Sequence, residues 1–208
     1  MGVIMTAARE PAQDESFSLP RPPAGGWTAD DLDELPDLPP HTELIDGGLV
    51  FMSPQTRFHT RTIHHLVGAL MAQAPEEWEA IGEMTVRLDR RNRPEPDVMV
   101  VSVEADTGAR QTVFEPEDVL LAVEVVSADS EERDREVKPY KFARAGIPHF
   151  WRVEESEGLP VVHVFELDPA TRSYGLTGIH RKQLTVDRPF PLDIDLTAVY
   201  PRGRRGSG

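Results

Sequence analysis

Two acidic residues and a lysine stand out because each borders or interrupts an apolar stretch of the sequence. Asp97 follows Pro96 and opens the run DVMVV, and Glu124 lies inside the apolar run VLLAVEVV. An unpaired carboxylate among apolar neighbours is either costly or keeps its proton. We therefore expect a metal ion, a lysine or hydrogen bonds to compensate Glu124. Lys138, in the polar segment that follows, is a candidate for this role.

The two acids are expected to converge at one edge of a sheet. If residues 97–101 and 119–126 pair as antiparallel strands, the start of the first lies beside the end of the second. Two carboxylates suit a hard divalent cation, since Mg²⁺ prefers oxygen ligands and keeps several waters. Such a cation activates water and stabilises charge on a phosphate, while Lys138 would add positive charge or orient the water.

Each of these residues also has a purely structural interpretation. Glu124 would equally fit a structural ion pair or a strand face that meets solvent. Asp97 would equally begin a turn or strand after its proline. Asp134 lies four residues before Lys138, which is also the spacing of an ordinary surface ion pair on a helix.

Other residue patterns exclude several kinds of site. His59, His64 and His65 lie in a predicted helix, but no two of them have the i, i+4 spacing of a zinc site. His59, at the start of that helix, is a possible accessory residue. Neither Ser53 nor Ser127 lies in a G-x-S-x-G motif, so a serine hydrolase is rejected. No phosphate-binding loop motif occurs.

The densest basic stretch, RLDRRNRPEPD, directly precedes Asp97. It suggests a phosphate-contacting loop beside the metal, and an exposed, solvated loop is the alternative. The arginines concerned are Arg87, Arg90, Arg91 and Arg93.

The surrounding pattern predicts one α/β or α+β domain with a mixed central sheet. The expected elements are a short helix capped by Thr28 and ending at Glu34, a hairpin at 43–52, a helix at 58–73, strands at 80–88, 97–101, 119–126, 149–153 and 161–167, and a short helix from Pro139 to a C′ glycine at Gly146. Because the residue before a proline is biased away from the α region, Lys138 is expected at the mouth of that helix.

Composition narrows the possible settings. The 208 residues include no cysteine, which excludes disulfides, thiolate metal sites and cysteine catalysis. The net charge of −14 argues against a broad charge-driven coating of nucleic acid. No apolar run is long enough to span a membrane and no secretory signal is evident, so a cytoplasmic location is expected. Residues 1–26 read as a disordered leader, 27–200 as the folded domain and 201–208 as a flexible basic tail.

Several motifs together resemble the Uma2 family, also called DUF820, whose members are usually described as restriction endonucleases. They are ELIDGGLVFMSP, a helix opening with His59, PEPDVMVVS, LLAVEVVS and DREVKPYKFARAGIPHFWRVE. The resemblance implies the PD-(D/E)XK nuclease fold, a mixed sheet flanked by helices with its active site at a sheet edge. By the same resemblance, Asp97, Glu124 and Lys138 are catalytic, and Glu43 is an additional acidic contributor.

The sequence departs from the wider superfamily in one position. Val126 stands where a lysine two residues after the acid is usual, so the resemblance relocates the lysine to Lys138. The function expected is hydrolysis of DNA phosphodiester bonds through a metal-activated water. Mg²⁺ or Mn²⁺ would be bound by Asp97, Glu124 and the Val125 carbonyl. A homodimer is plausible, and neither an organic cofactor nor a membrane partner is expected.

Two alternatives remain open from the sequence. One is a non-catalytic module that binds nucleic acid or protein on a nuclease fold, which the acidic charge and the missing lysine at position 126 favour. The other is a nuclease toxin, or a nuclease that a partner regulates.

Overall fold

The computed structural model describes residues 21–200. Most of the predicted leader (1–26) and the whole of the predicted tail (201–208) therefore lie outside the described residues. No helix among the described residues is long and apolar enough to cross a membrane.

The chain alternates short helices with strands. In order the elements are α1 (Asp31–Glu34), β1 (Thr42–Ile45), β2 (Gly48–Phe51), α2 (Arg57–Met71), β3 (Trp78–Gly82), β4 (Thr85–Val86), β5 (Val98–Ser102), β6 (Val113–Phe114), β7 (Val119–Val125), the π-helix η3 (Arg133–Val137), α3 (Lys138–Ala145), β8 (His149–Ser156), β9 (Leu159–Asp168), β10 (Ser173–His180), β11 (Gln183–Val186) and β12 (Leu192–Asp195). Single 3₁₀ turns occur at Val103–Ala105, Pro116–Asp118 and Leu196–Val199.

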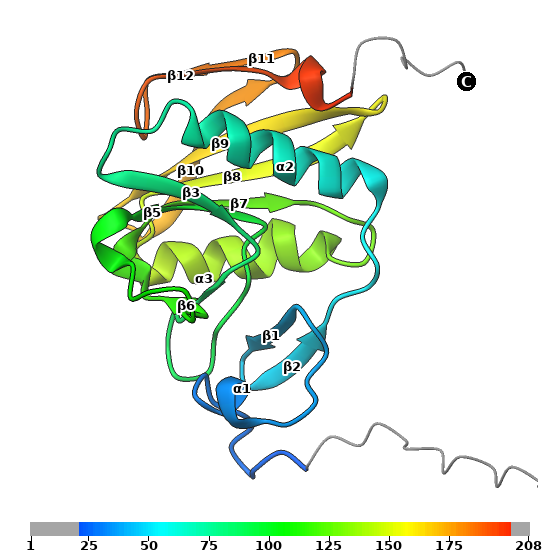
Figure 1. Cartoon of the computed structure of the whole chain (residues 1–208), viewed down its shortest axis with the longest axis vertical. Coiled ribbons are helices and arrows are strands. Elements are labelled where there is room, and N and C mark those ends of the chain that lie inside the picture. The colour runs from blue at the N-terminus through cyan, green and yellow to red at the C-terminus, as the bar shows by residue number, and fades with distance from the viewer. Residues whose placement is uncertain (1–20, 201–208) are drawn as a thin grey trace, which may run out of the picture.

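A mixed sheet forms the centre of the protein (Figure 1). Its strand order is β10-β9-β8-β7-β5-β3, with β7 and β8 parallel and every other neighbouring pair antiparallel. The crossover between the parallel strands runs through η3 and α3. The predicted mixed sheet with flanking helices is thus confirmed.

Apolar side chains cover both faces of this sheet. Helix α2 lies on one face and α3 on the other (Figure 1). Helix α2 contributes the buried stripe Phe58, Ile63, Leu66 and Leu70, which has the helical spacing expected from the sequence. On the other face, Phe142 of α3 packs with residues such as Met99 and Phe150.

The hairpin of β1 and β2 forms a small lobe below the sheet as drawn (Figure 1). Asp46 and Gly47 both have positive φ, +52° and +79°, as the tight two-residue turn of a hairpin requires. The predicted Asp46-Gly47 hairpin is therefore confirmed. Backbone bonds between Leu44 and Arg93 attach β1 to the segment that precedes β5, and this places Glu43 beside the sheet edge.

Two details differ from expectation. The predicted strand 80–88 is broken into β3 and β4 because Glu83 adopts a positive φ of 55°, which a continuous strand cannot contain. The predicted cap of α1 is also wrong. The N-cap residue is Asp30, whose side chain makes no capping bond, and Thr28 instead donates through its backbone N–H and its hydroxyl to the Asp31 carboxylate, at 2.7 and 2.8 Å.

Leu66 provides a direct test of how α2 packs against the sheet. Its side chain is fully buried, so Leu66→Ala should lower the free energy of unfolding by about 2–5 kcal/mol through lost apolar burial and a residual cavity. Met71, on the same helix, is 58% exposed, and Met71→Ala should change the free energy of unfolding by less than about 0.5 kcal/mol. Urea unfolding followed by circular dichroism measures both. Equal costs would contradict the packing described.

Candidate active site

The strand register brings Asp97 and Glu124 opposite each other. Strands β5 and β7 pair antiparallel with Val98 facing Val123, so the residues one step beyond that pair face each other. The antiparallel pairing that we expected is thus confirmed. The Val125 N–H donates to Asp97 Oδ2 at 2.6 Å, which fixes the orientation of that carboxylate.

Lys138 joins three acids that come from three elements. Its Nζ atom lies 2.8 Å from Glu43 Oε1 of β1, 3.1 Å from Glu124 Oε2 of β7 and 3.6 Å from Asp134 Oδ1 of η3. All four side chains are at most 2% exposed. The lysine therefore compensates Glu124, as the sequence led us to expect. It does so although the position two residues after Glu124, where the wider superfamily usually has a lysine, is occupied by the uncharged Val126.

The local backbone around Lys138 differs from the prediction. Lys138 has helical angles, φ −64° and ψ −46°, and it lies within an uninterrupted helical stretch at 131–145. The bias against helix before a proline is overcome because η3 is a π-helix. A wider turn relieves the contact between the Pro139 ring and the preceding turn, where Pro139 has no N–H to donate. Lys138 is thus held in mid-helix, not at a helix mouth.

Asp134 is a site residue that the sequence indicated only as a possible surface partner of Lys138. Its ion pair with Lys138 exists, but it is buried and not at the surface, since Asp134 is 2% exposed. Ser130 also donates to its Oδ2. The i, i+4 spacing was the available signal. This signal was not used because the helix was expected to begin at Pro139, after both residues.

His59 is brought to the site, as the accessory role required. Thr56 caps α2 by accepting from the His59 N–H at 3.2 Å, so His59 lies in the first turn of the helix. Its Nε2 lies 3.2 Å from Asp97 Oδ1, and its side chain is 5% exposed. The two other histidines of α2, His64 and His65, instead bond backbone carbonyls at the surface.

The site holds more buried negative charge than its lysine can balance. Burial raises the pKa of Glu124 well above its ordinary 4.5, and the acids Asp134, Asp97 and Glu43 raise it further, while Lys138 opposes them. Burial likewise raises the pKa of Asp134. Burial alone would lower the pKa of Lys138, but the surrounding carboxylates, Glu124 first, outweigh it and raise this pKa well above 10.5. The lysine is therefore charged, while burial opposes the ionisation of Glu124.

The donor set suits a divalent cation in part. Oε1 of Glu124 and Oε2 of Glu43 are buried oxygens without a hydrogen-bond partner, and Asp97 lies across the strand pair from Glu124. Oxygen ligands of this kind are those that Mg²⁺ and Mn²⁺ use. Within residues 21–200 no three acidic or histidine side chains are already gathered as a metal group, so such an ion would use one or two carboxylates and keep waters.

The expectation for Arg93 needs correction. Its guanidinium is buried, and it donates to Asp33 at 2.7 and 3.0 Å, to the Ala29 carbonyl at 3.0 Å and to Thr85 at 2.9 Å. These contacts use its donors to hold α1 against the sheet. Arg93 is therefore a structural anchor and not a phosphate contact.

The three other arginines of this stretch lie in the segment between β4 and β5. Arg87 pairs with Asp30 at 3.2 Å and Glu115 at 3.6 Å, and Arg91 donates to the Asp46 carbonyl. Arg90 is exposed. A phosphate-contacting role for these three residues stays a prediction.

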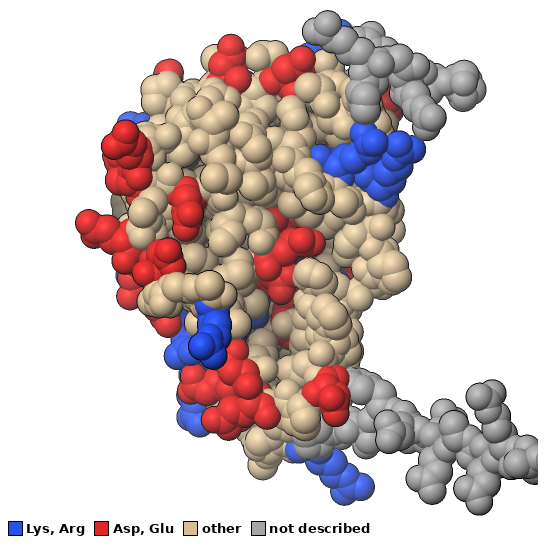
Figure 2. All heavy atoms as spheres, viewed as in Figure 1, with Lys and Arg blue, Asp and Glu red and all other residues tan. Residues whose placement is uncertain are grey.

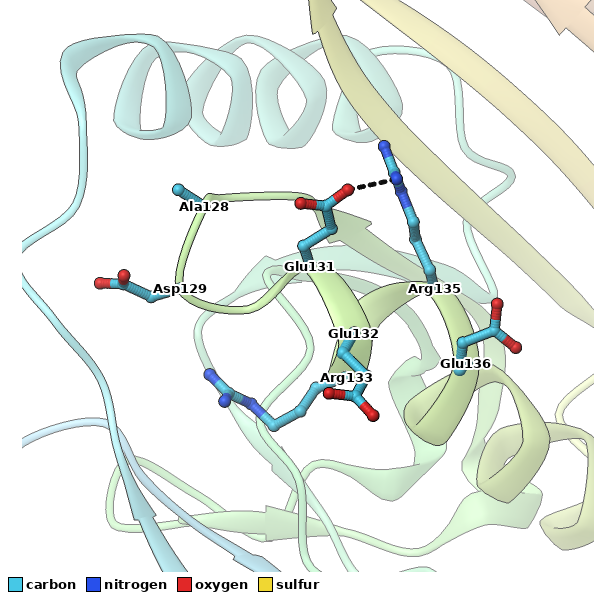
Figure 3. A pocket seen from close by; sticks show the side chains of 7 residues that line it. All are labelled: Ala128, Asp129, Glu131, Glu132, Arg133, Arg135 and Glu136. Atoms are coloured by element: carbon cyan, nitrogen blue, oxygen red, sulfur yellow. Dashed lines mark hydrogen bonds and ion pairs between the residues drawn. The ribbon is translucent and has the colours of Figure 1, made fainter.

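The helical stretch at 131–145, which carries Lys138, borders an open pocket of about 530 Å³ near its start (Figure 3). It is lined by Ala128, Asp129, Glu131, Glu132, Arg133, Arg135 and Glu136. Figure 2 shows acidic side chains in the hollow between the sheet and the β1–β2 lobe, and Figure 3 shows Glu131 paired with Arg135. The lining of this pocket carries more negative than positive charge.

Comparison with known proteins places the chain in a family. A family model described as "Uma2: Putative restriction endonuclease" matches residues 29–198, which is most of the sequence. The chain belongs to the Uma2 family. The family match covers the lobe with Glu43 as well as the sheet. A search of curated proteins finds no match.

Two solved structures are similar to this Uma2 protein, and one of them is similar enough to share its fold. A crystal structure of "a putative nuclease belonging to DUF820" from Anabaena variabilis matches with a TM-score of 0.60 and 15% identity, covering 83% of this chain and 96% of that one. NucC from P. aeruginosa, in a cAAA-bound form, matches with a TM-score of 0.33 and 12% identity, covering 61% of this chain and 85% of that one. The Uma2 chain therefore shares its fold with the DUF820 protein.

Lys138 should be indispensable for stability. Lys138→Met should lower the free energy of unfolding by about 3–5 kcal/mol, because it leaves three buried carboxylates without their cation. Lys141→Met is the matched control. Lys141 pairs with the exposed Asp46, so its loss should cost less than about 1 kcal/mol. Urea unfolding at neutral pH measures both, and a small cost for Lys138→Met would contradict the ion-pair network.

Glu124 should make the metal-free protein less stable as the pH rises. A buried acid whose folded pKa is raised binds its proton more tightly when folded, so its ionisation costs stability. That cost is absent below the ordinary value of 4.5 and complete above the raised pKa. In EDTA, Glu124→Gln should therefore match wild type near pH 4.5 and exceed it increasingly at higher pH.

The measurement is the midpoint of thermal unfolding across pH 4.5–9. Glu117, an exposed glutamate in the 3₁₀ turn before β7, provides the control, and Glu117→Gln should show no such pH-dependent gain. A variant at position 124 that is less stable than wild type at every pH would contradict a raised pKa for Glu124.

Proposed function

We propose that this Uma2 protein is a metal-dependent endonuclease that hydrolyses DNA phosphodiester bonds, with Mg²⁺ or Mn²⁺ as its cofactor, in the cytoplasm. The observation that carries the proposal is the excess of buried carboxylate over ammonium charge where β5 and β7 meet. Three acids, Glu43, Glu124 and Asp134, contact one buried lysine, and Asp97 lies across the strand pair from Glu124. A divalent cation would offset that excess, and family membership points to the same chemistry.

Each site residue has a role that follows from its contacts. Asp97, oriented by the Val125 N–H and by His59, would present one carboxylate to the cation. Glu124 would present its unpartnered Oε1. The N–H and C=O of a strand residue lie on the same edge of the strand, so the Val125 carbonyl faces the Asp97 side and would be a third oxygen donor.

When bound, the cation supplies charge stabilisation on the phosphate and activates water for attack. Lys138 holds Glu124 Oε2 and would place positive charge near the developing charge of the phosphate. Glu43 accepts from the Glu95 N–H at 2.8 Å and from Lys138, and so it would keep the lysine in position. His59 would act as a positioning residue for Asp97.

The second candidate is a non-catalytic binding module on the same fold. A lysine already paired with these acids would favour a structural ion-pair network over a metal site. The two candidates differ in metal binding. Calorimetric titration of Mn²⁺ into the purified protein should show binding for an endonuclease, and no binding for the module.

The decisive experiment is cleavage of supercoiled plasmid and single-stranded DNA. Wild type should cut in Mg²⁺ or Mn²⁺ and should stop in EDTA. Glu124→Gln and Asp97→Asn should each lower the rate by at least about 100-fold, since each removes an oxygen ligand at the reacting phosphate. The matched control Glu117→Gln, at an exposed glutamate remote from the site, should cut as wild type does.

Folding of each variant is checked by circular dichroism so that lost cleavage is not lost structure. Equal cleavage by wild type and Glu124→Gln would overturn the assignment of the site. Absence of cleavage by wild type, together with absence of Mn²⁺ binding, would favour the binding module.

A further inference from the structure

A second pocket lies on the far side of the helical stretch that carries Lys138. We call it the arginine pocket, and its volume is about 300 Å³, at the lower end of the range for small-molecule sites. Four arginines from three parts of the chain line it, and no acidic residue does. They are Arg135, Arg144, Arg152 and Arg172.

The positive charge of the arginine pocket contrasts with the negative charge of the rest of the molecule. The chain has a net charge of −14, and each of the four other pockets described on residues 21–200 has more acidic than basic side chains in its lining. Arg135 and Arg152 have carboxylate partners outside the lining, whereas Arg144 and Arg172 have no carboxylate partner within residues 21–200. The two arginines without such a partner, in a concave place, suit an anionic ligand.

Two of the arginines are held in place and two are available. Glu154 lies behind the pocket, and it pairs with Arg135 at 2.9 Å and with Arg152 at 2.9 Å. Among the described residues, no carboxylate pairs with Arg144 or Arg172, and both are exposed. Arg172 donates to the Arg144 backbone carbonyl at 3.1 Å, which brings the two residues together.

Apart from Thr171 and Ser173, the rest of the lining is aromatic or apolar. Phe150 and Tyr174 stack with ring centroids 5.4 Å apart, and Phe165 lies 5.6 Å from Phe150. The Tyr174 hydroxyl donates to the Ile147 carbonyl at 2.8 Å and so keeps its ring fixed. Tyr140, on the rim, is 65% exposed, so its ring is open to a ligand.

Aromatic faces and arginines are the groups on which nucleobases stack, and guanidinium forks match phosphate oxygens. We propose that the arginine pocket binds a nucleotide, with its phosphates on Arg144 and Arg172 and its base against Tyr140. The ligand would be either a free nucleotide or the phosphorylated end of a DNA strand. Both sources present the same planar base and phosphate. A free nucleotide would make the pocket independent of cleavage, whereas a strand end would rest on the proposed function.

The test is binding in EDTA, where no cleavage is expected, so the result does not depend on activity. Calorimetry on the full chain would use ATP, pyrophosphate, and trideoxynucleotides with a 5′-phosphate or a 5′-hydroxyl. Wild type should bind ATP or the 5′-phosphorylated trinucleotide below about 1 mM. ATP binding would identify a free nucleotide as the source. Binding of the 5′-phosphorylated trinucleotide alone would identify a strand end.

Variants separate the phosphate contacts from the stacking contact. Arg144→Gln combined with Arg172→Gln should weaken binding at least about tenfold for every phosphorylated probe, since two charge-assisted contacts are lost. Tyr140→Ala should weaken nucleotide binding several-fold and leave pyrophosphate binding unchanged. Arg110→Gln, at an exposed arginine away from the pocket, is the control and should bind as wild type does.

Three results would overturn the proposal. The first is absence of nucleotide binding by wild type. The second is unchanged affinity in the double arginine variant, and the third is pyrophosphate binding as tight as that of ATP together with no effect of Tyr140→Ala. Preferential binding of an acidic peptide over every nucleotide probe would likewise overturn it, in favour of a protein partner.

Discussion

The burial of one ammonium group among carboxylates is the constraint on which the rest of this Uma2 protein depends. Lys138 contacts Glu43, Glu124 and Asp134, which belong to the hairpin lobe, the central sheet and the π-helix. A buried ion pair costs desolvation, and it is tolerated only when its partners are well placed. The three elements must therefore meet with little freedom, and the lobe is fixed to the sheet partly by that requirement.

The same constraint explains why this segment forms a π-helix. An ordinary α-helix with a proline after Lys138 would be kinked or ended, and neither Asp134 nor Lys138 would then face the sheet together. The wider turn at Arg133–Val137 keeps the stretch helical and directs both side chains inward. It leaves Arg135 and Arg144 on other sides of the stretch, where they line pockets. One irregular helix thus serves the buried site and the arginine pocket.

Charge is distributed unevenly in the molecule. The acids concentrate in the buried site and along the hollow beside the lobe, while the arginine pocket holds a local excess of positive charge. Burial raises the pKa of Glu124, so ionised Glu124 costs stability that a neutral residue at this position would not.

Sequence alone determined the mixed sheet, the α2 stripe, the Asp46-Gly47 hairpin and the pairing that sets Asp97 opposite Glu124. These features depend on periodicity, turn chemistry and the antiparallel register, which are local or nearly local. Tertiary structure alone decided that Asp134 is buried, that Arg93 anchors α1 and that four arginines share a pocket. The residues concerned come together from separate segments, and their burial depends on what packs over them. The helical state of Lys138 also escaped the sequence, because the wider turn of the π-helix that accommodates Pro139 has no signal in the local sequence.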